Sequence, residues 1–157
     1  MHFREDQSAP AIGVRREVLE RDAELAVLAD AVQAAAGGGG CVVLIMGEAG
    51  IGKSSLVEAL RASLPASGRM LTGYCDDLAT PRTLGPFRDL VGSVRAELSQ
   101  AVMDGSDRDR VLAALHTELS LPEHPTVLVI EDVHWADDAT LDVLRFLIRR
   151  IADLPPS

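Results

Sequence analysis

A glycine-rich turn between two apolar runs most restricts how this chain folds. The run "CVVLIM" (41–46) is continuously apolar, as expected of a strand buried on both faces. The run "LVEALRASL" (56–64) carries its leucines and valine at helical spacing, and Pro65 ends it. The stretch "GEAGIGKSS" (47–55) joins the two and contains three glycines, which let a backbone turn tightly. A strand that leads directly into a helix favours an α/β fold.

The turn also matches the pattern G-x-x-x-x-G-K-[ST] between strand and helix. Glycines allow successive backbone N–H groups to surround phosphate oxygens at the positive end of the following helix. Lys53 would reach the β- and γ-phosphates, and the Ser54 hydroxyl would ligate Mg²⁺, which prefers oxygen ligands. The alternative is a turn that needs glycine only for its shape, with Lys53 as a solvated charge. The context favours a phosphate-binding loop for a nucleoside triphosphate. Its residues are Gly47, Glu48, Ala49, Gly50, Ile51, Gly52, Lys53, Ser54 and Ser55.

Two acids end a second apolar run, "TVLVIED" (126–132). If this strand joins the phosphate-loop strand in one sheet, Glu131 and Asp132 lie near the phosphates. We expect Glu131 to hold Mg²⁺ through water and Asp132 to position or deprotonate the attacking water. Lys53, Glu131 and Asp132 are thus the catalytic candidates, and Ser54 and Glu131 the metal-binding candidates. The alternative is that the acids only end the strand and cap the segment after it.

The spacing of apolar residues and the turn residues predict the remaining helices and one more strand. They are a helix from the N-cap Asp22 to the glycines at 37–40, a strand at 69–74, an amphipathic helix from Pro86 to Leu98, a helix capped by "SDRD" (106–109) that runs to Ser120, and a last helix capped by Asp137 or Asp138. Strands that alternate with helices predict a parallel sheet wrapped by helices. Residues 1–16 show no periodicity and are expected to form a flexible leader.

Composition excludes several classes of function. The chain of 157 residues carries a formal net charge of -9, and its basic residues are scattered, so direct nucleic-acid binding by this segment is disfavoured. No apolar run is long enough to span a membrane, and we expect a cytoplasmic protein. Cys41 and Cys75 have no metal-ligand spacing and are expected to be reduced and largely buried.

These residues resemble the signal-transduction branch of P-loop ATPases, the STAND ATPases. The resemblance rests on "GEAGIGKSSL" and "VLVIEDVHWADDATLDVLRFL". More narrowly, the chain is similar to the AAA-type ATPase module at the N-terminus of large LuxR-family transcriptional regulators. "LERDAEL" (19–25) is similar to the family's segment near the adenine, and "CDDLATPRTLGPFRDL" (75–90) looks like its stretch after the second strand. The resemblance covers residues 17–154, and we expect 17–157 to be the N-terminal part of such an ATPase domain.

The resemblance implies binding of Mg-ATP and slow hydrolysis that serves as a conformational switch, so the chain is an ATP hydrolase if the domain is complete. By position, Glu131 matches the magnesium-associated acid and Asp132 the second acid. Many relatives have Asp first, so the division of labour between these two acids stays open. For "HWAD" (134–137), the favoured interpretation is that Trp135 anchors packing and Asp137 caps the last helix.

In the family, the acidic strand is followed by two more strands, a helical lid and, far downstream, a DNA-binding helix-turn-helix. The first of those strands lies between the phosphate-loop strand and the acidic strand. We therefore expect a sheet truncated before its last strands, with ATP, missing downstream domains or a second copy of the chain as partners. Two other interpretations stay open: a small phosphotransferase of the nucleotide-kinase kind, and a non-catalytic remnant.

Overall fold

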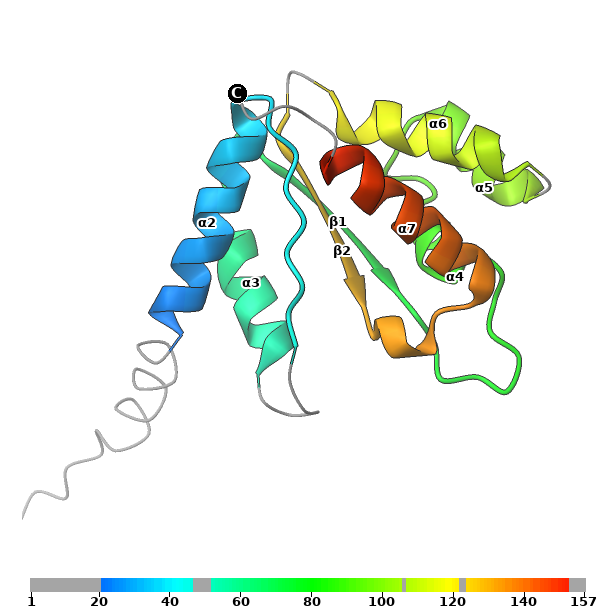
Figure 1. Ribbon diagram of the computed structural model, residues 1–157, viewed down its shortest axis with the longest axis horizontal. Helices are drawn as coiled ribbons and strands as arrows, with labels where there is room; N and C mark the ends of the chain where they lie inside the picture. Colours follow the sequence, from blue (N-terminus) through cyan, green and yellow to red (C-terminus); the bar gives the residue numbers. More distant parts are fainter. Residues whose placement is uncertain (1–20, 47–51, 106, 122–123, 153–157) are drawn as a thin grey trace, which may run out of the picture.

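The computed structural model describes residues 21–46, 52–105, 107–121 and 124–152. Its elements are α2 (Asp22–Ala36), α3 (Lys53–Ser63), β1 (Arg69–Tyr74), α4 (Gly85–Arg88), α5 (Ala96–Asp104), α6 (Arg108–Leu119), β2 (Thr126–Glu131), the 3-10 turn η1 (Val133–Trp135) and α7 (Asp138–Ala152). Figure 1 shows the two strands between two groups of helices, with α2 and α3 on one side and α4 to α7 on the other. The predicted α/β class, a parallel sheet wrapped by helices, is confirmed.

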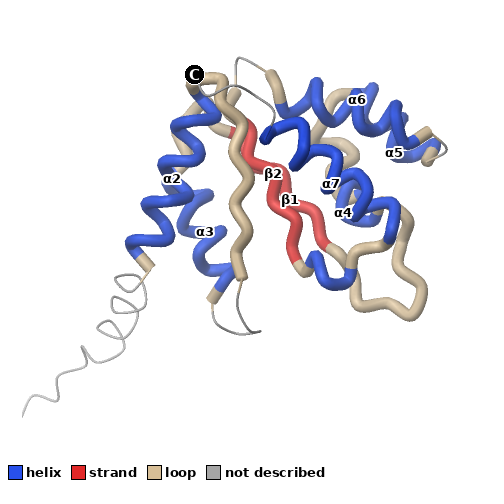
Figure 2. Tube along the Cα trace, viewed as in Figure 1, coloured by secondary structure: helices blue, strands red, loops and turns tan. Residues whose placement is uncertain are grey.

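The two strands form a parallel pair in which Arg69 lies opposite Thr126 and Tyr74 opposite Glu131. Figure 2 shows the two strands side by side in one sheet. In such a sheet, successive side chains point to opposite faces. One face carries Met70 and Val127, which pack against the cluster formed by α2 and α3. The other face carries residues such as Leu71, which belongs to the larger core under α4 to α7. The sheet is therefore covered on both faces, which accounts for the nearly continuous apolar character of β2.

The expectation of a strand at 41–46 is wrong. The structure describes this segment without strand pairing, and Leu44 and Met46 expose 74% and 81% of their surface. Cys41 is also exposed, against expectation, whereas Cys75 is buried as expected. The physical reason is the lack of a neighbour: among the described residues the sheet consists of β1 and β2 alone, so no ladder bonds hold this segment and little covers its side chains. Ile45 packs against the α2–α3 cluster.

The expectation of one amphipathic helix from Pro86 to Leu98 is also wrong, because the segment is divided between α4 and α5. The single turn of α4 gives way to a series of turns before α5 begins. Gly92 lies in this region with a φ of +93°, a left-handed conformation that ends helical geometry. The apolar stripe still packs inward, since Phe87, Leu90 and Leu98 are all buried in the larger core.

The start of α2 lies one residue before the expected position, and the cap of α6 lies within the expected "SDRD" stretch. Arg21, rather than Asp22, occupies the N-cap position of α2. Asp107 caps α6, and its carboxylate accepts hydrogen bonds from the backbone N–H groups of Asp109 and Arg110. The other caps are as expected: α2 ends at the glycines, and Asp137 directly precedes α7, where its carbonyl accepts the N–H of Leu141. The expected leader at 1–16 lies outside the described residues.

Candidate functional site

The carboxyl ends of β1 and β2 meet at one edge of the sheet. The backbone N–H of Cys75, just after β1, donates to the carbonyl of Glu131, the last residue of β2, at 3.0 Å. Figure 1 shows that α3 begins at the same end of the sheet. Residues that are far apart in sequence and follow different elements thus share this edge, as is usual for ligand sites in parallel α/β sheets.

The first turn of α3 is connected to the end of β2 by side chains. The Ser54 hydroxyl donates a hydrogen bond to Glu131 Oε2 at 3.3 Å, across 77 residues of chain. The Ser54 side chain is exposed and Glu131 is half-buried, so solvent and small ligands reach both. A hydroxyl and a carboxylate are the hard oxygen donors that Mg²⁺ selects, so this pair fits the implied cation. No cluster of three or more His, Cys, Asp or Glu suited to a metal occurs in the ranges that the structure describes.

The rest of the predicted phosphate loop is only partly described. Gly47, Glu48, Ala49, Gly50 and Ile51 lie outside the described residues. Gly52 has a φ of +88°, a left-handed conformation that glycine adopts without strain, and it is the N-cap of α3. Lys53, Ser54 and Ser55 follow as the first residues of that helix, where backbone N–H groups have no helical acceptor. The positive end of the helix dipole is therefore directed to the same edge as Glu131.

Asp132 directly follows Glu131 and has a different backbone conformation. Its φ is +57°, a conformation that Asp adopts more readily than most residues with a side chain. It is exposed and precedes η1, and its carbonyl accepts the N–H of Trp135 at 2.8 Å. The left-handed turn directs the chain away from the strand immediately after Glu131. The two acids thus differ in backbone conformation, since Glu131 is the last strand residue and Asp132 is left-handed.

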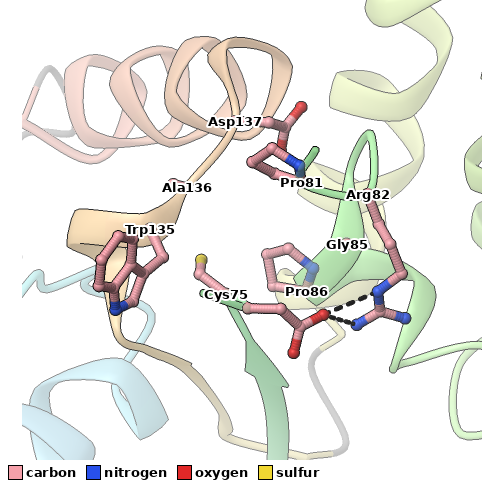
Figure 3. Close-up of a pocket in the computed structure, with 9 residues that line it drawn as sticks. Cys75, Pro81, Arg82, Gly85, Pro86, Trp135, Ala136 and Asp137 are labelled. Carbon is pink, nitrogen blue, oxygen red and sulfur yellow. Dashed lines mark hydrogen bonds and ion pairs between the residues drawn. The ribbon is translucent and has the colours of Figure 1, made fainter. Parts of the chain in front are cut away.

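A small hollow lies beside this edge, between the loop after β1 and the segment after β2 (Figure 3). Arg82 holds the loop together, because its guanidinium contacts Asp76 Oδ2 at 2.7 Å and Asp89 Oδ1 at 3.2 Å. Asp89 also accepts the backbone N–H of Tyr74 at 2.9 Å. The lining residues are Cys75, Asp76, Pro81, Arg82, Gly85, Pro86, Trp135, Ala136 and Asp137. Of the predicted phosphate-loop residues that the structure describes, residues 52–55, none lines this hollow.

The "HWAD" segment joins this loop to α7 through Asp137. Asp137 Oδ2 accepts the backbone N–H of Leu84 at 3.3 Å, and Oδ1 accepts the hydroxyl of Thr140 in the first turn of α7. Leu84 has a φ of +55°, which is uncommon for a buried leucine, and the Asp137 bond helps to hold it there. Trp135 is 42% exposed and stacks at a tilt on His134, so the expectation that it anchors packing is wrong.

Burial and negative charge together make the Cys75 thiol unreactive. Loss of hydration is the largest cause that raises its pKa from 9.0 to about 11, and the carboxylates of Asp137, Asp132, Asp76 and Asp89 act in the same direction. At neutral pH the thiol is protonated. Its thiolate fraction then rises only as the pH approaches 11, so Cys75 behaves as a small apolar side chain against the end of β1.

We expect Cys75 to react with iodoacetamide at least about tenfold more slowly than the exposed Cys41 at about pH 8.5, because alkylation requires an accessible thiolate. The ratio is measured by mass spectrometry of the two cysteine peptides. In concentrated urea the environment of Cys75 is lost, and both cysteines should react at similar rates. Equal rates in the folded chain would contradict the burial of this thiol.

Sequence reasoning did not single out the arginines at this edge. Arg82 pairs with acids six and seven residues away across an irregular loop, and no periodicity indicates such contacts. Arg21 donates from Nη1 to the carbonyl of Gly52 at 3.0 Å. The resemblance of "LERDAEL" to a family segment marked the neighbourhood of Arg21 but gave that residue no partner.

The parallel α/β fold is that of a P-loop type module, and a family match supports the same class. A family model described as the AAA ATPase domain matches residues 17–156. The chain therefore belongs to the AAA ATPase domain family, whose members bind nucleotide, usually with Mg²⁺. The chain has no match among curated proteins and none among solved structures. Across the described ranges, no helix is both long and apolar enough to cross a membrane.

Proposed function

We propose that this chain binds Mg-ATP at the Ser54–Glu131 edge, hydrolyses it slowly and uses the bound nucleotide as a conformational switch in a cytoplasmic signalling or transcriptional regulator. The observation that carries the proposal is the hydrogen bond between the Ser54 hydroxyl and Glu131. It joins the predicted phosphate loop to the predicted acidic strand, the two halves that a nucleotide with its cation must bridge. The regulator context rests on the resemblance of "HWAD" and "TPRTLGPFRDL" to the LuxR-family module.

Each residue has a distinct role in this proposal. Lys53 contributes a positive charge to the β- and γ-phosphates. Ser54 and Glu131 contribute oxygen atoms to the Mg²⁺ site, Glu131 through water. Asp132 positions the attacking water or accepts its proton, which is a role for an acid at the edge of the site rather than inside the cation's shell. The bound cation supplies charge stabilisation on the phosphates.

Titration calorimetry with Mg-ATP tests the proposal on the 157-residue chain. We expect saturable binding by the unmodified chain and a loss of affinity of at least about tenfold for Lys53→Ala, because a cation at the phosphates is removed. Glu131→Gln should leave the affinity for ATP without magnesium unchanged. It should reduce the increase in ATP affinity that Mg²⁺ causes. Arg110→Ala is the matched control, since it removes one positive charge at an exposed pair with Asp104, on α5 and α6.

Lys53 also allows a second, independent readout, because it is the one lysine in the sequence. An amine-directed reagent therefore labels Lys53 and the N-terminal amine, and the two products are separated by peptide mass spectrometry. Mg-ATP should slow labelling of Lys53 and leave the N-terminus unchanged. If the unmodified chain neither binds Mg-ATP nor shows this protection, the proposed function is wrong.

The phosphotransferase alternative makes a different prediction in the same assay. A kinase-like enzyme consumes ATP faster when an acceptor is added, whereas a switch hydrolyses its bound nucleotide slowly and keeps the product bound. A single-turnover experiment with excess protein, repeated with nucleoside monophosphates, separates these two outcomes. Absence of any ATP consumption, together with tight binding, would favour the non-catalytic interpretation.

A further inference from the structure

A contact between Arg21 and Gly52 joins α2 to the start of α3. Arg21 precedes α2, and its Nη1 donates to the Gly52 carbonyl at 3.0 Å across 31 residues, in a partly buried position. The apolar residues Leu28, Val32, Leu56 and Leu60 pack the two helices together beyond this contact. The guanidinium is therefore presented to Gly52 by a helix pair that is already held by its own core.

The guanidinium also lies against the face of Gly52 that lacks a side chain. A Cβ placed on Gly52 would be 3.4 Å from both Cζ and Nη2 of Arg21. The planar group thus covers the glycine while one of its nitrogens binds the carbonyl. The same carbonyl accepts the N–H of Leu56 at 3.1 Å, the first hydrogen bond of α3. A carbonyl oxygen has two lone pairs, so it accepts both donors.

The bond to this carbonyl fixes more than one atom. The carbonyl of Gly52 and the N–H of Lys53 belong to the same planar trans peptide, so they point in opposite directions and turn together. Gly52 is left-handed, a conformation in which glycine has broad freedom. The Leu56 N–H restrains its carbonyl from within α3, and the Arg21 guanidinium adds a second restraint from the start of α2. Holding the carbonyl towards α2 holds the Lys53 N–H on the opposite side.

We propose that Arg21 is a positioning residue of the phosphate site, which sets the 52–53 peptide plane so that the N–H groups at the start of α3 are preorganised for phosphate oxygens. This inference rests on the proposed function, since it assigns a task to Arg21 in nucleotide binding. Preorganised donors bind a phosphate without the cost of ordering them at the moment of binding. Removal of Arg21 therefore weakens the binding of phosphate-bearing ligands, while the apolar core between α2 and α3 remains.

The experiment compares Arg21→Ala, Arg21→Lys and the control Arg110→Ala by calorimetry with Mg-ATP, and by melting temperature. We expect Arg21→Ala to bind about tenfold more weakly, the change produced by losing one charge-assisted hydrogen bond. Arg110→Ala removes the same charge far from α3 and should bind as the unmodified chain does. All three should melt within a few degrees of one another, which separates positioning from a loss of fold.

Arg21→Lys separates geometry from charge. An ammonium keeps the positive charge but cannot both cover Gly52 and bind its carbonyl, so we expect it to restore part of the lost affinity. A positioning effect persists at about 0.5 M salt, where long-range attraction between charges is screened. If the lysine variant binds as tightly as the unmodified chain and the effect of Arg21→Ala disappears at high salt, Arg21 acts through charge alone and the inference is overturned.

Hydrogen exchange supplies a readout that needs no nucleotide. In Arg21→Ala the amide of Leu56, which bonds to the Gly52 carbonyl, should exchange several-fold faster, while the amide of Leu60 one turn later is unchanged. Unchanged exchange at Leu56 together with unchanged Mg-ATP affinity overturns the inference and leaves the proposed function standing. If the unmodified chain itself does not bind Mg-ATP, the proposed function fails and the positioning role in phosphate binding fails with it.

Discussion

Gly73→Ala should strongly destabilise the folded chain. A Cβ at Gly73, in β1, would lie 2.1 Å from the carbonyl oxygen of Pro86 and 2.7 Å from its carbonyl carbon. These atoms belong to the backbone of α4, so no side-chain rotation relieves the overlap, and β1 must separate from α4. We expect a loss of about 3 kcal/mol or more in the free energy of unfolding, at the upper end for overpacking. Urea denaturation followed by circular dichroism measures the loss.

Gly85→Ala is the matched control for this prediction. Gly85 lies next to Pro86 in α4, and a Cβ there would meet Arg82 Cβ at 3.5 Å, an ordinary van der Waals separation. The same chemical change in the same contact region should therefore alter stability by no more than about 1 kcal/mol. Similar stabilities of Gly73→Ala and the unmodified chain would mean that β1 and α4 are further apart than described.

Glu118→Ala should have the second large effect. Glu118 is 1% exposed, and its two carboxylate oxygens accept from Arg69 Nη1 at 2.7 Å and from the backbone N–H of Arg95 at 3.1 Å. Removal of the carboxylate leaves a partly buried guanidinium and a backbone donor without these acceptors. We expect a loss of about 3–5 kcal/mol, the range for breaking a buried pair on one side. Chemical denaturation gives the value directly.

Two further variants show whether this loss comes from the buried pair. Glu118→Gln keeps the shape and one acceptor oxygen, so its loss should be smaller than that of the alanine variant. Glu58→Ala removes an acid from an exposed pair with Arg61 and should cost no more than about 0.5 kcal/mol. A loss for Glu118→Ala as small as that for Glu58→Ala would show that the Arg69 pair contributes little net stability.

The local parts of the fold and the site were readable from the sequence because they depend on short-range patterns. The strand at 126–131 follows from an apolar run, and the strand at 69–74 from a weaker pattern that includes Met70, Leu71 and Tyr74. The expectation that Ser54 and Glu131 come near each other needed one further step, the parallel order of a sheet in which carboxyl ends share an edge. The particular role of each residue stays a prediction.

The incorrect expectations depend on spatial neighbours or on backbone conformations that residue spacing does not reveal. The run at 41–46 has the composition of a buried strand, but burial requires strands beside it, and the described sheet places none there. The apolar stripe from Phe87 to Leu98 has helical spacing, yet Gly92 takes a left-handed conformation that the spacing does not reveal. Trp135 is the kind of residue that usually packs inside, and here it lies at the surface beside His134.

The long separation between the two halves of the site has a thermodynamic consequence. Ser54 and Glu131 are 77 residues apart, and the pairing of β1 with β2 brings together residues 57 apart. In an unfolded chain these groups meet rarely, because closing so long a loop costs conformational entropy. A ligand that needs both groups has no site on the unfolded chain. Its binding free energy then adds to the stability of the folded state, and the melting temperature of this protein becomes a measure of ligand concentration.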